Sequence, residues 1–490
     1  MKRIWICLLA AMLLASCGTS TVEDATTDNN DNGANTTETA GETETTVDDL
    51  FLVTKEDNGG KTFTLLTTET QQYEYDAVEM NGDVVNDAVY NRNLAVEELL
   101  GIDFEFVYKP GDWANRKSYC QLIQNSIMAA DGAFDIVSGM ISCVQPIAST
   151  QIFMNVYDVP DIHLDNPWWV SELQDGLTIS GKLIGFIGDM SLSMYKGLSV
   201  IFANLDLLED RSMEDPYALV LNNEWTLDKM IEVAGGAGQD LNGDGKFTLG
   251  DDLYGMIIYE VAYRSVQASL DIQAVGLNED GVPTINPLGD KMSTAVDKLT
   301  AFLKIDDVLC ENQSTEERSI VNGYFAADKV LYYMTKLESL DDLRDMESDF
   351  AILPYPKYDA DQDKYLTLIA TASQMTYIPT TTNDVALSGK VCEALSYYSY
   401  KDVVPSYYDV ALKNKYSRDE NTQKMLDIIR AGAVMPFEYA YSTVIGGKVW
   451  PNMLLCNASL NEDGNVASLL ASMESVWESS IEEVMETYGD

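Results

Sequence analysis

The chain has 490 residues and a formal charge of −48, with 79 Asp and Glu residues against 31 Lys and Arg residues. This balance excludes nucleic acid as a partner, because binding to it requires a basic face. The cysteines after residue 17 are odd in number and widely spaced, which argues against a zinc cluster and a full disulfide framework. The sequence is compatible with a single disulfide, for instance between Cys120 and Cys143.

The first 17 residues have the pattern of an export signal. Lys2 and Arg3 precede an apolar run over residues 4–14, which is too short to span a membrane as a helix. The run ends in Leu-Ala-Ser-Cys17, which resembles a bacterial lipobox. This resemblance implies that Cys17 carries a diacylglyceryl group and tethers the protein to the outer face of the cell membrane. The alternative is an ordinary signal peptide with a chance cysteine.

Residues 18–58 are predicted to form a disordered acidic linker. The stretch 18–50 is rich in Asp, Glu, Thr and Asn, lacks Lys and Arg, and has few apolar residues. Such a segment buries too little surface to offset its chain entropy, and its like charges extend it. We expect it to hold the folded part away from the membrane.

Strands and helices alternate after the linker. Strands are expected at 62–67, 102–108 and 133–137, with amphipathic helices at 83–100 and 118–130. This order implies a largely parallel, doubly wound α/β sheet. Ligands of such sheets bind outside the carboxyl ends of the strands, so the loops after these strands are candidate binding loops.

The chain is then expected to cross to a second lobe. A glycine-spaced strand at 181–188, a polar crossing at 189–194 and an apolar strand at 197–208 predict the crossing. A helix begins after Thr226, and a strand near 350–357 ends in a Pro-x-Pro turn. Residues 365–377 read as a strand that returns to the first lobe. The remaining helices are expected at 385–401, 422–431 and 466–488.

The acidic stretch 240–252, DLNGDGKFTLGDD, follows the ligand order of an EF-hand calcium loop. A glycine, Gly245, falls at loop position 6, where the chain must turn sharply. Its predicted ligands are side-chain oxygens and one backbone carbonyl, from Asp240, Asn242, Asp244, Lys246 (carbonyl), Thr248 and Asp251. Asp252 is the alternative to Asp251 if the register is shifted by one, and a solvated acidic turn without an ion is the alternative to calcium. Because the loop is single, a calcium sensor and a dockerin are disfavoured.

These pieces, in this order, resemble the extracellular solute-binding proteins of ABC importers, in their carbohydrate-binding, maltose-binding-protein-like group. The resemblance lies in LGIDFEF, GAFDIVSGM, GKLIGFIGDMSLSM, NEWTLDKM, DLNGDGKFTLGDDLYGM, FAADKVLYYM, DFAILPYPKYDADQDKYL and RDENTQKMLDII. It implies an α/β, two-lobed periplasmic-binding-protein-like fold of type II, with a hinge of crossing strands and a helical carboxyl-terminal part. Lobe 1 is expected to comprise 59–188 and 368–404, and lobe 2 to comprise 189–367 and 405–490. A calcium ion at 240–252 is expected to be structural.

Sugar recognition needs aromatic faces together with carboxylates and amides. Trp113 is a candidate because it lies in a polar loop after a strand, where nothing in the local pattern asks for burial. The resemblance implies Asp189 at the cleft floor and Tyr439 or Tyr441 as an aromatic from the carboxyl-terminal part. Further candidates, by position, are Trp450, Tyr73, Tyr75, Ser138 and Met140. The alternative for each aromatic is core packing, and for Asp189 a hinge-turn aspartate.

The resemblance implies a monomeric, lipid-anchored receptor that captures a sugar or oligosaccharide and delivers it to a membrane permease. A surface glycan-binding lipoprotein without a transporter is the first alternative. A glycoside hydrolase is the second, but no motif singles out a pair of carboxylates or a nucleophile in the sequence. We therefore expect a binding protein rather than an enzyme.

Overall fold

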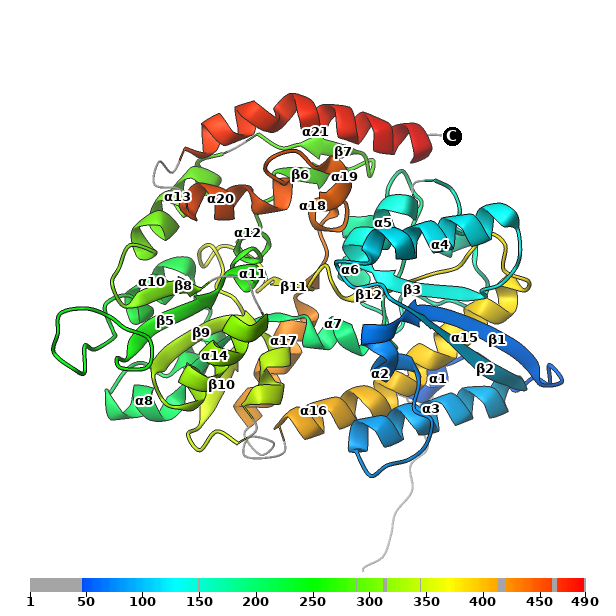
Figure 1. The fold of residues 1–490 in the computed structure, drawn as a ribbon, viewed down its shortest axis with the longest axis horizontal. Helices are drawn as coiled ribbons and strands as arrows, with labels where there is room; N and C mark the ends of the chain where they lie inside the picture. Colours follow the sequence, from blue (N-terminus) through cyan, green and yellow to red (C-terminus); the bar gives the residue numbers. More distant parts are fainter. Residues whose placement is uncertain are drawn as a thin grey trace, which may run out of the picture. The chain divides into compact units, whose positions relative to one another are not determined.

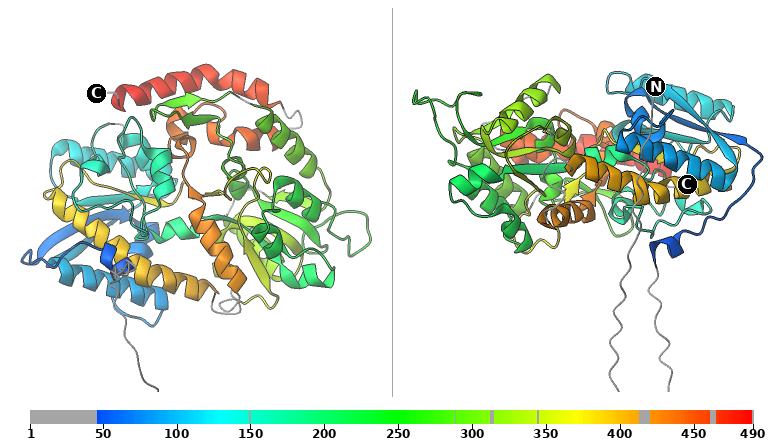
Figure 2. Two further views of the ribbon diagram at one scale, coloured as in Figure 1. Left: turned by 180° about the vertical axis from the view of Figure 1, so that it is seen from behind. Right: turned by 90° about the horizontal axis from the view of Figure 1, so that it is seen from below.

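The computed structural model describes residues 46–148, 150–287, 289–311, 315–343, 345–412, 420–460 and 465–488 (Figures 1 and 2). The predicted signal, the lipobox with Cys17 and the predicted linker up to residue 45 lie outside these residues. From Val47 onward the chain forms one unit. Among the described residues, no helix combines the length and the apolar character needed to cross a membrane.

The last part of the predicted linker, residues 47–58, belongs to the folded unit, so the prediction of disorder up to residue 58 is wrong there. A short helix, α1 (Val47–Leu50), precedes Phe51, whose ring stacks on Tyr397 with centroids 4.0 Å apart. Val53 is buried, and Glu56 forms an ion pair with Lys390. The apolar residues at 51–53 supply contacts with the folded unit that the acidic composition of the whole segment does not indicate.

The first lobe contains a four-stranded sheet in the order β12-β3-β1-β2. Strands β1 and β2 are parallel, as are β1 and β3, whereas β12 runs antiparallel to β3. The strands are β1 (Lys61–Thr68), β2 (Ile102–Lys109), β3 (Ile136–Met140) and β12 (Gln374–Tyr377). The helices are η1 (Glu69–Gln71), α2 (Gln72–Tyr75), α3 (Val84–Leu100), α4 (Arg116–Ala129), α5 (Ile141–Ala148), η2 (Val156–Asp158), α6 (Ser171–Leu177) and α15 (Val385–Tyr398).

Helix α3 begins and ends where the sequence predicts. The carboxylate of Asp83 accepts hydrogen bonds from the backbone N–H groups of Val85 and Asn86 and so caps the first turn. Gly101 ends the helix with φ 60°, a conformation that glycine adopts without strain. A Cβ at this position would lie 2.8 Å from the backbone nitrogen of Asn58, so the close approach of the preceding segment also requires glycine.

The second lobe contains a five-stranded sheet in the order β10-β4-β9-β5-β8. Strand β5 is parallel to both β8 and β9, while β4 and β10 form an antiparallel edge. The strands are β4 (Ser199–Asn204), β5 (Tyr254–Tyr259), β8 (Val308–Glu311), β9 (Val330–Lys336) and β10 (Phe350–Leu353). The helices are α8 (Leu205–Asp210), α9 (Pro216–Leu221), α10 (Leu227–Ala234), α11 (Glu260–Tyr263), α12 (Val266–Ser269), α13 (Asp290–Phe302), α14 (Thr315–Ala326) and η3 (Leu337–Asp342).

The chain passes between the two sheets in irregular segments rather than in long strands. The predicted strand at 181–188 makes only isolated bridges, one of them between Phe186 and Thr376. The polar crossing contains a helical turn, α7 (Leu192–Lys196). The predicted strand at 365–377 is divided into β11 (Thr367–Leu368), which pairs with β13 (Ala433–Val434), and β12. Glycine and serine between these pieces favour turns over a continuous ladder.

The carboxyl-terminal part is helical, as expected, but its first helix stays with the first lobe. After the π-helical turn η4 (Ser399–Val403), α16 (Val404–Leu412) packs against α3, so these residues differ from their assignment to lobe 2. Helix α21 lies over α20 and the hairpin of β6 and β7 (Figure 1). The remaining elements are β6 (Val275–Leu277), β7 (Pro283–Ile285), α17 (Glu420–Ala431), α18 (Phe437–Ala440), α19 (Ser442–Ile445), η5 (Pro451–Met453), α20 (Leu454–Leu460) and α21 (Val466–Tyr488).

Candidate functional site

The parallel strands of each sheet end on the side that carries the segments expected to bind ligand. In the first lobe these segments are η1 with α2, the loop 110–115 and α5. In the second lobe they are α11 and η3. An ion pair of 3.1 Å joins Lys196 on α7 to Asp341 on η3, and the Lys196 ammonium lies 4.8 Å from the ring centre of Tyr73 on α2. The carboxyl ends of the two sheets therefore approach one another near α7.

Trp113 lies in the loop after β2 and is 47% exposed. The Arg116 guanidinium covers one face of its ring, 3.8 Å from the ring centre. The loop is held on the end of the first sheet, because a side chain at Gly111 would collide with Thr68, the last residue of β1. Trp113 is thus an aromatic surface on a fixed loop at the carboxyl end of β2.

Trp450 approaches Trp113 from the carboxyl-terminal part. Its ring centre lies 6.4 Å from that of Trp113, with the two planes at 57°. Trp450 precedes η5, where the Pro451 carbonyl accepts a hydrogen bond of 2.9 Å from the side-chain amide of Gln267 on α12. Since α12 follows β5, the Trp113–Trp450 pair joins the carboxyl end of the first sheet to that of the second.

Tyr439 and Tyr441 are buried, and their hydroxyl groups are used inside the protein. The Tyr439 hydroxyl donates to the Arg264 carbonyl at 2.8 Å. The Tyr441 hydroxyl is 2.5 Å from that of Tyr488 and accepts from the Gln145 amide at 2.9 Å. In this structure neither ring is open to a ligand, so both tyrosines contribute to packing beneath the candidate site.

Asp189 is fully buried and engaged by two partners. An ion pair of 3.0 Å joins it to Arg430 on α17, and the Tyr195 hydroxyl donates to it at 2.5 Å. Burial raises the pKa of the Asp189 carboxyl to about 6, while Arg430 acts in the opposite direction. The predicted cleft-floor acid therefore braces the crossing between the lobes in this structure.

Met140 is the last residue of β3, and Tyr75 is the last residue of α2, which follows β1 and η1; Tyr75 is buried and Met140 partly buried. The Tyr75 hydroxyl is 2.9 Å from the Ser138 hydroxyl and 3.4 Å from that of Ser191 in the crossing segment. Met140 is partly buried, and its sulfur lies 3.5 Å from the Cys143 thiol. Cys143 is not joined to Cys120 by a disulfide.

The structure also brings together charged residues that the sequence prediction did not include. Arg264, the residue after α11, forms an ion pair of 3.0 Å with Glu260 of that helix, and Arg318 on α14 forms one with Glu338 of η3. Both pairs lie just beyond the carboxyl ends of β5 and β9. Each pair includes a residue that closely follows a strand. This position would have indicated the pairs from the sequence if the ends of the strands had been predicted correctly.

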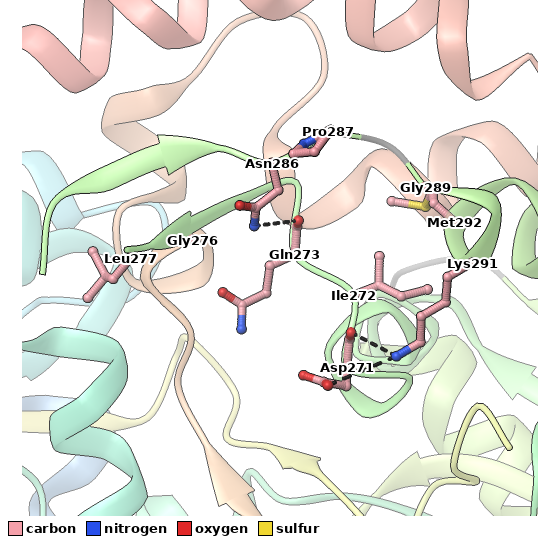
Figure 3. A pocket seen from close by; sticks show the side chains of 10 residues that line it. All are labelled: Asp271, Ile272, Gln273, Gly276, Leu277, Asn286, Pro287, Gly289, Lys291 and Met292. Carbon is pink, nitrogen blue, oxygen red and sulfur yellow. Dashed lines mark hydrogen bonds and ion pairs between the residues drawn. The ribbon is translucent and has the colours of Figure 1, made fainter. Parts of the chain in front are cut away.

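Two adjoining hollows lie beside the β6–β7 hairpin. The first, with a volume of 320 Å³, is lined by polar groups that include Gln273, Asn286 and Lys291 (Figure 3). The second, of 280 Å³, shares Asp271 with the first and extends toward α6 and α18. A third hollow of 510 Å³ lies at the carboxyl end of β1, over η1, α2 and the start of α3. Of the predicted ligand residues, Tyr73 lines the third hollow, and the others line none of the three.

The acidic loop 240–252 is closed by hydrogen bonds from its own backbone. The carboxylate of Asp240 accepts from the N–H groups of Gly243 and Gly245 at 2.6 and 2.8 Å. It is Asp252, and not Asp251, whose carboxylate turns inward and is fully buried. Backbone hydrogen bonds lower the pKa of Asp252, the largest contribution coming from the N–H of Thr248.

The donor set of this loop is all oxygen, which fits calcium in type. In the described part of the chain, however, no group of three or more Asp, Glu, His or Cys side chains gathers where a metal ion would sit. Asn242, the Lys246 carbonyl and Thr248 would have to complete the ligand set. The loop thus has the order and turn geometry of a calcium site without a preformed cluster of carboxylates.

Comparison with known proteins identifies the fold. No model of a known protein family matches the sequence, and no curated protein matches it either. The structure superimposes on a cyclo/maltodextrin-binding protein complexed with maltotetraose, with a TM-score of 0.51 and 16% identity, over 88% of this chain and 98% of that one. It superimposes on the GacH receptor of Streptomyces glaucescens GLA.O, solved unliganded and with acarbose, with a TM-score of 0.50 and 11% identity, over 88% and 99% of the two chains. The predicted fold class is confirmed: the chain has the two-lobed α/β fold of these maltodextrin- and acarbose-binding proteins.

Proposed function

We propose that this protein captures a sugar or oligosaccharide outside the cell and delivers it to an ABC importer. The proposal combines the shared fold with one observation, the Trp113–Trp450 pair. Two indole rings whose centres are 6.4 Å apart, one exposed and one partly buried, offer apolar faces of the kind that stack on the C–H faces of pyranose rings.

The position of this pair also suits a receptor that closes on its ligand. A ligand shifts an equilibrium between open and closed forms only if it binds one form more tightly than the other. Trp113 follows β2 of the first lobe, and Trp450 lies beside α12 of the second. A sugar stacked across the exposed side of both rings would contact both lobes and so favour the closed form.

A binding protein agrees better with the acids of the site than a hydrolase does. A retaining or inverting hydrolase needs two carboxyl groups about 5–9.5 Å apart, both of which face the scissile bond. Asp189 is occupied by Arg430 and Tyr195, and Glu260 and Glu338 are each paired with an arginine. These pairings leave no obvious acid and base for hydrolysis among them.

We further propose that the loop 240–252 binds a structural calcium ion through Asp240, Asn242, Asp244, the Lys246 carbonyl and Thr248. Asp252 would replace Asp251 as the acid at the far end of the loop. Because this loop does not contain the aromatic pair, removal of calcium by a chelator should lower the melting temperature and leave sugar affinity nearly unchanged. Loss of affinity without a change in melting temperature would contradict a purely structural ion.

We propose that a lipid on Cys17 holds the protein on the outer face of the membrane. A Cys17→Ala variant should appear in the medium or the soluble extracellular fraction, while the parent protein stays with the membrane and labels with a radioactive fatty acid. A parent protein that is soluble and unlabelled would leave an ordinary signal peptide as the explanation.

Sugar capture is tested by calorimetric titration of the protein with a panel of neutral and charged oligosaccharides, with Trp fluorescence as a second signal. We expect one class of oligosaccharide to bind and to change the fluorescence of Trp113 and Trp450. Release of a cleaved product would favour a hydrolase instead. Importer function is tested by deletion of the gene, which should abolish uptake of the bound sugar, whereas a surface glycan-binding lipoprotein would leave uptake intact.

A further inference from the structure

Three cationic side chains gather at the carboxyl ends of β5 and β9. They are Arg264, Arg318 and Lys336, which we call the basic cluster. Lys336 is the last residue of β9 and pairs in register with Ser199, whose hydroxyl donates to that of Ser265, the residue after Arg264. Arg318 bonds to Glu338, two residues beyond Lys336. The three cations therefore surround one corner of the second lobe.

Lys336 differs from its two neighbours because the described residues offer its side chain no hydrogen-bond or ion-pair partner. Arg264 is paired with Glu260 and Arg318 with Glu338. Among the described residues, no hydrogen bond or ion pair reaches the ammonium group of the partly buried Lys336. Burial lowers the pKa of Lys336, Arg318 and Arg264 lower it further, and Glu338 opposes them. A partly desolvated cation without a counterion is costly unless an anion from outside binds to it.

Arg318 also keeps unused hydrogen-bonding capacity. Its Nε atom is buried and has no partner in the described part of the structure. The guanidinium lies 6.0 Å from the ring centre of Tyr259, the last residue of β5. The three cations of the basic cluster thus outnumber the two carboxylates that are paired with them, Glu260 and Glu338.

The basic cluster contrasts with the rest of the chain and lies on the ligand side of the second lobe. Acidic residues outnumber basic ones by 79 to 31 over the whole sequence. Yet η3, which carries Glu338, also holds the Asp341 that pairs with Lys196 at the junction with the first lobe. The cluster thus borders the region where the carboxyl ends of the two sheets meet.

We propose that the sugar captured by this protein carries an anionic substituent, a carboxylate or a sulfate, and that Lys336 binds this group with Arg264 and Arg318 beside it. This inference rests on the proposed function and adds the chemical class of the ligand. A charge-assisted hydrogen bond to the Lys336 ammonium satisfies the unpaired cation, and the arginines add a favourable field. The aromatic pair would bind the sugar ring, and the basic cluster would select its charge.

The test compares paired oligosaccharides that differ only in charge. The probes are neutral hexose oligomers of gluco, manno and galacto configuration, the matching hexuronate oligomers, and O-sulfated forms of the neutral oligomers. We expect a uronate or a sulfated probe to bind at least about tenfold more tightly than its neutral counterpart, because a hydrogen bond to a charged group contributes that much. The preference should decrease as ionic strength rises. Comparison of the uronate probes with the sulfated probes shows which of the two anionic groups the protein prefers.

Variants connect this preference to Lys336. Lys336→Met should remove most of the preference for the charged probe and leave affinity for the neutral probe unchanged, while Lys336→Arg should retain the preference. Lys304→Met is the matched control, because Lys304 is exposed near the start of β8, at the opposite end of the same sheet. Melting temperatures of all variants establish that they are folded.

The outcomes distinguish the inference from the proposed function. If neutral probes bind as tightly as both charged forms, or if Lys336→Met weakens neutral and charged probes equally, sugar capture stands and the selection of an anionic group is wrong. If no oligosaccharide of the panel binds, the proposed function fails and the inference fails with it.

Discussion

The Trp113–Trp450 pair and the buried cluster of Asp189, Arg430 and Tyr195 were both predicted, in part, as ligand contacts, and the structure separates them. Trp113 is half exposed and lies on a loop outside a strand end. Asp189 is fully buried, with its carboxylate occupied by a guanidinium and a phenol. The first group is open to a ligand, and the second holds the protein together.

The two groups differ in the process to which they contribute free energy: ligand binding for the aromatic pair, and folding for the buried cluster. A partly exposed aromatic surface, such as the part of Trp113 that Arg116 leaves uncovered, gains stability when a ligand covers it. A buried ion pair has already exchanged its hydration for protein contacts, so its removal affects folding first. We therefore expect substitutions in the two groups to separate stability from affinity.

The largest expected effect is that of Asp189→Ala on stability. The substitution leaves the Arg430 guanidinium without its carboxylate, next to a tyrosine that loses its acceptor. The free energy of unfolding should fall by about 3–5 kcal/mol, measured by urea unfolding followed by circular dichroism. Asp189→Asn, which keeps one acceptor oxygen, should lose less. A loss of stability below about 1 kcal/mol combined with abolished sugar binding would instead make Asp189 a direct ligand contact.

A second buried acid, Glu74 on α2, lacks the partners that Asp189 has. It is fully buried, and neither carboxyl oxygen has a hydrogen-bond partner in the described part. Burial raises the pKa of Glu74 from 4.5 to about 8, and Ser193, Arg92 and Lys196 nearby act in the opposite direction. The folded state therefore holds the proton that the unfolded chain releases above pH 4.5.

Because burial raises the pKa of Glu74, the free energy of unfolding is expected to fall as the pH rises. The contribution of Glu74 to stability is complete below pH 4.5 and is lost as the pH rises through about 8. Glu74→Gln removes the titration, so its free energy of unfolding relative to the parent protein should rise by roughly 3 kcal/mol between pH 5 and pH 8. Urea unfolding at both pH values measures this, with the exposed Glu79→Gln as control. Equal pH dependence in the parent protein and the Glu74 variant would show that Glu74 stays ionised.

Local sequence signals predicted the elements well where the signal was itself local. Helix α3 is capped by Asp83 and ended by Gly101, as the sequence indicates, and the strands β1 and β2 lie within one or two residues of their predicted bounds. The prediction of a disordered linker is wrong at residues 47–58. Composition alone cannot show that Phe51 contacts Tyr397, which lies more than three hundred residues away. Tertiary contact overrides a local prediction of disorder in that segment.

At the candidate site, too, the predictions agree with the structure where the signal is local and differ from it where a residue's partners are distant in the sequence. Trp113 was identified because a tryptophan in a polar loop has no local reason to be buried, and this argument needs no partner. Tyr441 was misjudged because its hydroxyl partners, Gln145 and Tyr488, come from distant parts of the chain. The sequence prediction did not include Lys336, because a lysine at the end of a strand looks like an ordinary solvated residue until the arginines beside it are placed.

The smallest effect on stability, and the most informative for function, is expected at the aromatic pair. Trp113→Ala and Trp450→Ala should each lower sugar affinity by about twofold to tenfold, since aromatic contacts contribute about 0.5–1.5 kcal/mol beyond the area that they bury. The free energy of unfolding should change by less than about 1 kcal/mol for the exposed Trp113. Tyr157→Ala is the matched control, because Tyr157 is 49% exposed on the first lobe and does not belong to the pair.

The double variant decides whether the two rings act together. If one sugar stacks across both rings, each single substitution already disrupts the shared contact, so the loss in the double variant should be smaller than the sum of the single losses. Strictly additive losses would indicate two separate subsites. If the Trp113 and Trp450 variants bind as the parent protein does while Asp189→Asn, still folded, does not bind, the roles of the open pair and the buried cluster are reversed, and the buried carboxylate reaches the ligand through a conformation other than the one described.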